Sequence, residues 1–110
     1  MNRGEIWTVA GGVYSTKPRP AVIVQDDLFD ATSSVTVAPM SRTLLDAPLM
    51  RIRIARGEGR LSGLDHDSDV MIDKLTTVKR SNVHVRVGRL TVEQVIEVER
   101  AMMAFLGLAR

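Results

Sequence analysis

Two prolines bracket an arginine in the segment KPRP, residues 17–20, directly before the apolar run AVIVQ at 21–25. Proline fixes its own φ angle and biases the preceding residue toward extended backbone, so we expect Lys17 and Arg19 to be extended. One interpretation is strand punctuation beside a solvated arginine. The other is a guanidinium held at the rim of a sheet, where its planar fork binds two oxygens of a phosphate.

A hydroxyl and a cation are adjacent in the segment APMSR, where Ser41 precedes Arg42. Ser41 follows an expected strand, so its side chain falls in a loop beside the cation. The simpler interpretation is a turn serine that bonds its own backbone.

The sequence contains only two histidines, His66 and His84. An acid–base ribonuclease built on two imidazoles would need both in one cleft. His84 is expected on the outward face of a strand and His66 in an acidic loop. We therefore do not expect the two rings to form a catalytic pair.

The common cofactor and metal motifs are missing from the sequence. It has no P-loop, no GxGxxG and no HExxH motif. It has no cysteine, which rules out a zinc–thiolate site or a thiol nucleophile. The acidic segment DHDSD at 65–69 does not have the spacing of an EF-hand loop and is interpreted as a solvated loop. We expect no cofactor and no metal.

Length and composition favour one small domain spanning residues 1–110, with 45% hydrophobic residues to form a core. The 15 basic and 13 acidic residues nearly balance. Bases gather in STKPR, RIRIAR and KLTTVKR, whereas acids gather in QDDLFD and LDHDSD. This segregation fits either a basic face that binds nucleic acid or solvated charges around the molecule.

No apolar run approaches the ~20 residues of a membrane span. The N-terminal MNRGEIW also lacks the apolar core of a signal peptide. We therefore expect a cytoplasmic protein with no membrane contact.

Period-2 alternation and β-branched residues predict short strands over most of the chain. In the strand expected at 49–55, Met50, Ile52 and Ile54 should share one face. In the strand at 83–88, Val83 and Val85 should face inward together with Val87. A loop with a helical turn is expected at 26–34. The expected strands are 5–10, 21–25, 35–40, 49–55, 70–73 and 83–88.

The C-terminal segment changes to helical spacing. Thr91 and Gln94 form a capping-box pattern at the start of the helix. Val95, Val98, Met102 and Phe105 then recur on one face, and Gly107 is placed to end the helix. Together these elements predict a mainly β fold with a C-terminal helix (β+α), arranged as a small bent barrel.

These segments, in this order, resemble the MazF/PemK toxins of bacterial toxin–antitoxin pairs. The matching parts are RGEIWTV at 3–9, RPAVIVQDD at 19–27, VTVAPMS at 35–41, VMIDKLTTV at 70–78 and VGRLTVEQVIEVERAMMAFLGL at 87–108. The resemblance implies an SH3-like barrel of the CcdB/PemK type that forms a homodimer. It further implies a sequence-specific, ribosome-independent, metal-independent endoribonuclease that cuts single-stranded mRNA through attack of the 2′-hydroxyl on the adjacent phosphate. A cognate antitoxin with a flexible acidic tail would neutralise it.

The resemblance also implies roles for individual residues. The family arginine before proline falls on Arg19, and the family hydroxyl residue, usually threonine, falls on Ser41. Asp73 falls where some relatives carry a functional acid, so it is a candidate for catalytic support, but the general base stays unassigned. The implied RNA contacts are Lys17, Arg42, Lys74, Thr76, Lys79 and Arg80.

Two departures from the family pattern bear on RNA recognition. Thr76 stands where many relatives carry arginine or lysine, so a contact is lost or moved to Lys74. The first loop, GGVYSTK, lacks the acid that many relatives have there. Two alternatives therefore stay open: a non-catalytic barrel toxin of the gyrase-poison type, and an inactive homologue that binds RNA or protein.

Overall fold

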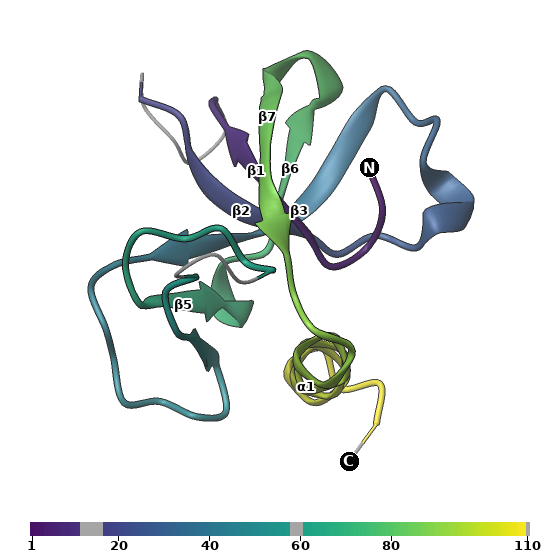
Figure 1. Cartoon of the computed structure of the whole chain (residues 1–110). Coiled ribbons are helices and arrows are strands. Elements are labelled where there is room, and N and C mark those ends of the chain that lie inside the picture. The colour runs from purple at the N-terminus through teal and green to yellow at the C-terminus, as the bar shows by residue number, and fades with distance from the viewer. Residues whose placement is uncertain (12–16, 58–60, 110) are drawn as a thin grey trace.

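The computed structural model describes residues 1–11, 17–57 and 61–109. Figure 1 shows a bent sheet with the α-helix α1 (Val92–Phe105) packed beside it. All strand pairings are antiparallel. The strands are β1 (Glu5–Val9), β2 (Arg19–Ile23), β3 (Ser34–Ser41), β4 (Arg51–Ile54), β5 (Ser68–Met71), β6 (Thr76–Lys79) and β7 (Val83–Arg89).

The strand order is β4-β5-β3-β2-β1-β7, and β6 pairs with β3 beside this path. The expected class, mainly β with a C-terminal helix, is confirmed. The order ends at β4 on one side and at β7 on the other, so within the described residues the sheet is bent but not closed.

Strand β3 joins the two halves of the sheet. Its first part pairs with β2 and β6, and its last two residues, Met40 and Ser41, pair with β5. Through this change of partner, the end of β3 joins the part of the sheet that β4 and β5 form. Ser41 therefore lies at a junction of strands, where loops from both halves meet.

The two faces of β2 and β3 are buried in two separate cores. Val22 and Ala38 belong to a core that α1 covers through Val98. Ala21 and Val37 belong to a second core on the opposite face. Because side chains alternate between faces along a strand, burial on both faces explains why AVIVQ and VTVA carry so few polar residues.

All six expected strands are present, although β2 begins at Arg19, earlier than predicted, so Arg19 and Pro20 of KPRP belong to the strand. The sequence analysis missed β6. The loop expected at 26–34 does contain a helical turn, the 3₁₀ helix η1 (Asp27–Phe29). Two more 3₁₀ turns, η2 (Ile72–Lys74) and η3 (Arg80–Asn82), flank β6.

Two expectations about strand faces were wrong. Val85 was expected inside but its side chain is 62% exposed. The register between β1 and β7 shifts on both sides of Trp7, and such an irregularity re-aims the side chains that follow. Met50 lies in the turn before β4 and is exposed, so it does not share the buried face of Ile52 and Ile54.

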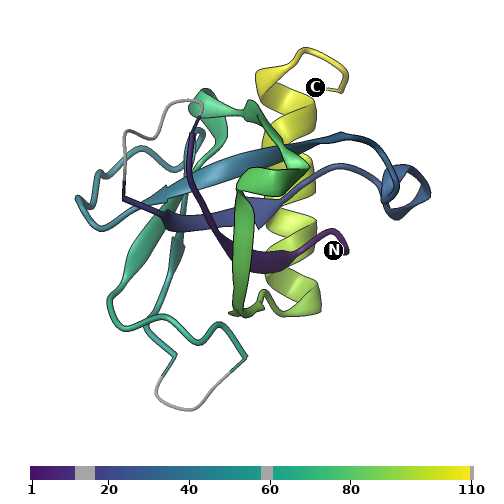
Figure 2. The ribbon, with the colours of Figure 1, turned by 90° about the horizontal axis from the view of Figure 1, so that it is seen from above.

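The helix α1 (Val92–Phe105) begins as predicted. The Thr91 hydroxyl accepts a hydrogen bond from the Gln94 amide at 3.1 Å, and the Gln94 side chain accepts one from the Thr91 amide at 2.8 Å. Gly107 adopts a φ of 72° just after the helix, a conformation that favours glycine. Phe105 was expected on the buried face but is 46% exposed. Figure 2 shows α1 running across one side of the strands.

No helix in the described part of the chain is long and apolar enough to cross a membrane.

Candidate functional site

An open cavity of about 1000 Å³ lies where β2 begins and β3 ends. The antiparallel register pairs Ala21 with Pro39. In this antiparallel pair β2 begins at Arg19 and β3 ends at Ser41, so the two residues belong to strand ends on the same side of the pair. Both residues line the cavity, and so do Pro20 and Pro39 between them. The structure thus brings together the two side chains for which the sequence predicts catalysis.

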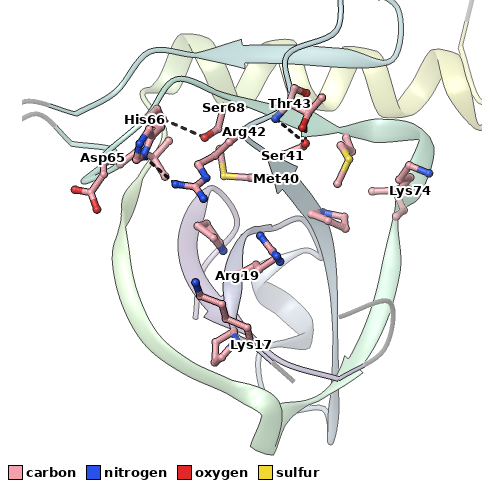
Figure 3. A pocket seen from close by; sticks show the side chains of 16 residues that line it. Lys17, Arg19, Met40, Ser41, Arg42, Thr43, Asp65, His66, Ser68 and Lys74 are labelled. Carbon is pink, nitrogen blue, oxygen red and sulfur yellow. Dashed lines mark hydrogen bonds between the residues drawn. The ribbon is translucent and has the colours of Figure 1, made fainter. Parts of the chain in front are cut away.

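The cavity is strongly positive. Four cationic side chains line it, against one carboxylate, Asp65, among the described lining residues. No hydrogen bond or ion pair to a described residue engages the Arg19 guanidinium or the ammonium groups of Lys17 and Lys74. Figure 3 shows Arg19 and Lys17 directed into the open space. Cations gathered around an open cavity fit a polyanion such as a nucleic-acid backbone. The four cations are Lys17, Arg19, Arg42 and Lys74.

The Ser41 hydroxyl forms the turn contact that its sequence context allowed. Its oxygen accepts a hydrogen bond from the Thr43 amide at 3.1 Å, and it lies 3.3 Å from the Thr43 carbonyl. The first contact fixes the side chain at the rim of the cavity. The second is long, so the hydroxyl hydrogen can turn toward a bound phosphate.

A buried carboxylate holds the loop that follows Ser41. Asp69 is paired with Ser41 in the β3–β5 register and is fully buried. Its oxygens accept hydrogen bonds from the Leu45 amide at 2.8 Å and from Arg53 Nε at 2.7 Å. Burial alone would raise the pKa of Asp69, but these hydrogen bonds and the cationic charge hold the pKa below its usual value. The sequence analysis missed the pair of Asp69 with Arg53 because it placed Asp69 in a solvated loop.

Asp73, the candidate for catalytic support, is in an ion pair with Arg51. Asp73 Oδ1 lies 3.2 Å from Arg51 Nε. That atom pair lacks hydrogen-bond alignment, whereas Arg51 Nη2 donates to Asp73 Oδ2 at 3.5 Å. Asp73 does not line the cavity, although Lys74 next to it does. The pair leaves this carboxylate engaged with β4 and away from Arg19.

Three of the implied RNA contacts do not line the cavity. Thr76 begins β6 and pairs with Val37 in the middle of β3, and Lys79 pairs with Ser34 at the start of β3. β3 has eight residues. At about 3.3 Å per residue its two ends are about 23 Å apart, so Lys79 is far from Ser41. Arg80 turns toward the loop after η1, where its Nε donates to the Thr32 carbonyl at 2.6 Å.

The structure separates the two histidines. His66 lines the cavity, and its Nδ1 lies 3.4 Å from Arg42 Nη1. His84 is exposed on β7 and does not line it. The expectation that they do not form a pair agrees with this arrangement. No local pattern indicates that His66 reaches the cavity, because the loop from 61 to 67 is positioned by contacts distant in sequence.

The described residues contain no cluster of three or more histidine, aspartate or glutamate side chains that could hold a metal ion. The first-loop residues 12–16, where the family acid is lacking, lie outside the described residues.

Residues 2–106 match the family described as PemK-like, MazF-like toxin of type II toxin–antitoxin system. The chain is 51% identical, over 99% of each sequence, to a protein of Mycolicibacterium smegmatis named probable endoribonuclease MazF. Among solved structures it resembles Mycobacterium tuberculosis toxin MazF-mt6, with a TM-score of 0.81 and 20% identity over 96% of this chain and 99% of that one. It also resembles a mycobacterial endoribonuclease solved in complex with its cognate antitoxin, with a TM-score of 0.79 and 19% identity over 100% of this chain and 98% of that one.

Proposed function

This chain belongs to the PemK-like, MazF-like family of toxins and is an endoribonuclease, and we propose that it cuts single-stranded mRNA at specific sequences in the cavity between β2 and β3. The observation that carries the proposal is the meeting of Arg19 and Ser41 in one open cavity lined by four cations. The activity would need neither the ribosome nor a metal ion.

The proposed reaction is an internal transfer at phosphorus. The ribose 2′-oxygen attacks the adjacent phosphorus, the bond from phosphorus to the 5′-oxygen breaks, and the products are a 2′,3′-cyclic phosphate and a 5′-hydroxyl. Arg19 donates two hydrogen bonds to the phosphoryl oxygens as their charge grows. Ser41 donates a third hydrogen bond once its hydroxyl turns away from Thr43. Lys17, Arg42 and Lys74 hold the neighbouring phosphates.

Two partners complete the proposal. The first is a second copy of the chain, in a homodimer. The second is a cognate antitoxin whose flexible acidic tail would occupy the cationic cavity in place of RNA. The complex of a structural relative with its own antitoxin supports such a partner. Because the substrate is mRNA, we expect the protein to act in the cytoplasm.

The test is to incubate the pure protein with a long in-vitro transcript in EDTA and to map the fragment ends. Discrete cuts with 2′,3′-cyclic phosphate and 5′-hydroxyl ends support the proposal. A transcript with deoxyribose at the mapped position should resist cleavage. Intact RNA together with stalled DNA gyrase would favour the gyrase-poison alternative, and intact RNA alone would favour an inactive homologue.

A further inference from the structure

His66 is the imidazole in a cavity whose other polar side chains cannot serve well as a base. Ammonium and guanidinium groups only donate hydrogen bonds. A serine or threonine hydroxyl holds no lone pair basic enough to take a proton near neutral pH. Asp65 is the one carboxylate of the described lining residues, and Figure 3 places it on the outer side of His66, away from Arg19. Imidazole changes its protonation between pH 5 and 8, which suits proton transfer at neutral pH.

Arg42 lies beside the ring of His66. Arg42 Nη1 and His66 Nδ1 are 3.4 Å apart. Because a guanidinium has no acceptor, Arg42 donates to this atom only in the tautomer that carries the lone pair on Nδ1. A phosphate held by Arg42 would therefore lie beside the atom that is ready to accept a proton.

The loop that carries His66 is anchored on both sides of the ring. Upstream, Leu64 is buried and its carbonyl accepts a hydrogen bond from the Gly57 amide at 2.7 Å. Downstream, the buried Ser68 hydroxyl donates to the His66 carbonyl at 3.1 Å. The Asp67 carboxylate accepts a 2.8 Å hydrogen bond from the backbone amide of residue 56. A fixed backbone keeps the imidazole at the cavity without the cost of ordering it when RNA binds.

Glycines bring the start of this loop onto β7. Gly63 has a φ of 65° and packs on the Val87 carbonyl, and a Cβ on Gly88 would collide with the carbonyl oxygens of Leu61 and Ser62. The Arg89 amide stabilises this close approach by donating a hydrogen bond to the Leu61 carbonyl at 2.8 Å. The placement of His66 thus depends on a strand far along the chain.

We propose that His66 is the general base of the cleavage reaction, an inference that rests on the proposed ribonuclease function. As Arg42 shifts its hydrogen bond to the bound phosphate, His66 Nδ1 accepts the proton of the ribose 2′-hydroxyl. The 2′-oxygen forms its bond to phosphorus and the bond to the 5′-oxygen breaks. The departing oxygen takes a proton from water, and the imidazolium returns its own proton to the solvent. Of the charged groups that line the cavity, Arg42 contacts the ring and Asp65 precedes it in the chain, and the others are Lys17, Arg19 and Lys74.

The experiment compares His66→Gln with the matched control His84→Gln, which removes the exposed imidazole of β7. The probe is a short RNA oligonucleotide that contains a cut site mapped with the wild-type protein. Single-turnover cleavage is followed from pH 5 to 9, and RNA binding is measured on the same oligonucleotide with deoxyribose at the scissile position. Circular dichroism checks that both variants fold.

Loss of a general base should slow cleavage by about 10²–10⁴-fold. Loss of one neutral hydrogen bond should weaken RNA binding by less than about tenfold. The wild-type rate should fall about tenfold per pH unit on the acid side, because protonation removes the lone pair. His66→Gln should lose that acid limb, imidazole should restore part of the rate to His66→Ala, and His84→Gln should match the wild type.

Three results would overturn the inference. His66→Gln could cleave within a few-fold of the wild type, it could keep the acid limb, or its cleavage and binding could fall by the same factor, which would make His66 a binding residue. A wild-type protein that cuts no RNA would overturn the proposed function as well, so the two failures are distinguishable.

Discussion

Arginine, and not simply a positive charge, is required at position 19 by the proposed chemistry. Arg19 begins β2, and its guanidinium has no partner among the described residues. A guanidinium bridges two phosphoryl oxygens, whereas an ammonium meets them as a point charge on a flexible stem. We predict that Arg19→Lys loses nearly as much cleavage as Arg19→Ala, about 10²–10³-fold in single-turnover rate. Equilibrium binding of RNA to Arg19→Lys should weaken much less.

The control for that comparison is Arg80→Lys, which changes an arginine distant from the cavity in the same way. It should leave both rate and affinity unchanged. Cleavage by Arg19→Lys at a rate near that of the wild type would mean that Arg19 acts as a generic cation. KPRP would then be no more than strand punctuation.

The buried Asp69 links stability to pH. Its pKa is held below the ordinary value near 4, so the folded state favours the charged form more than the unfolded state does. Its contribution to the free energy of unfolding is therefore complete above about pH 4 and is lost as pH falls through the lower, folded pKa. Asp69→Asn should destabilise the protein by about 2–3 kcal/mol at pH 7.

Urea unfolding of both proteins at several pH values checks this prediction. The difference between wild type and Asp69→Asn should stay constant from pH 7 to about pH 4 and should shrink as pH falls below about 4. A difference that stays constant below about pH 4 as well would show that the carboxylate charge contributes nothing and that only the shape of the side chain matters.

Functional residues that stand in a recognisable local sequence pattern were predictable. Residues whose position depends on partners distant in the sequence were not. Arg19 lies between two prolines and Ser41 lies two residues after Pro39, and the antiparallel pairing of β2 with β3 places these two strand ends on the same side. Asp69 is hidden in an acidic segment, and nothing local shows that Arg53 pairs with it from β4. His66 belongs to the same segment, and its place depends on contacts with β7 that the sequence does not reveal.

At the scale of elements, alternation predicted strands well and failed where strands are short or irregular. β6 has four residues between two 3₁₀ turns, so TTVK is too short for its alternation to stand out. Val85 follows a register shift against β1, which no periodicity in β7 indicates. The helix α1 was predictable at both ends because its capping box and Gly107 are local signals.

The position of β6 leads to a prediction about salt. Lys74 lines the cavity just before β6, whereas Lys79 ends β6 at the far end of β3. Four cavity cations, at about 0.7 per contact with single-stranded RNA, predict a fall in log K of about 3 per tenfold rise in salt. Lys74→Ala should reduce that slope by about 0.7, and Lys79→Ala should not change it.

Titration of a fluorescent RNA at several salt concentrations measures both slopes. Equal slopes for Lys74→Ala and the wild type, with a reduced slope for Lys79→Ala, would place the RNA along β6 and not in the cavity. That result would restore the wider set of contacts implied by the family resemblance.

On the scale of the whole molecule, charge and apolar surface are separated. The net charge is only +2, yet the cavity gathers four cations on one side of the sheet. Helix α1 buries Val98 against the core and leaves a second apolar stripe exposed. The stripe consists of Val92, Ile96, Met103 and Leu106, at i, i+4, i+11 and i+14, and is interrupted at i+7 by Glu99, which pairs with Arg3 at 2.9 Å. The side of the helix turned away from the core carries Glu93, Glu97 and Arg100.

We predict that a second copy of the chain covers this stripe in the proposed homodimer. A spacing of this kind forms a straight seam along a helix, and the core of one small domain does not reach it. Met103→Glu would place a charge in the seam and should weaken the dimer by about 2 kcal/mol or more, roughly thirtyfold in dissociation constant. Ala104→Glu is the matched control, because it adds the same charge one position away on the polar side of α1. Sedimentation equilibrium of the wild type and both variants at micromolar concentration measures the dissociation constants of the dimers. Dimers of equal strength would exclude the stripe from the interface, and monomers alone in the wild type would exclude the homodimer itself.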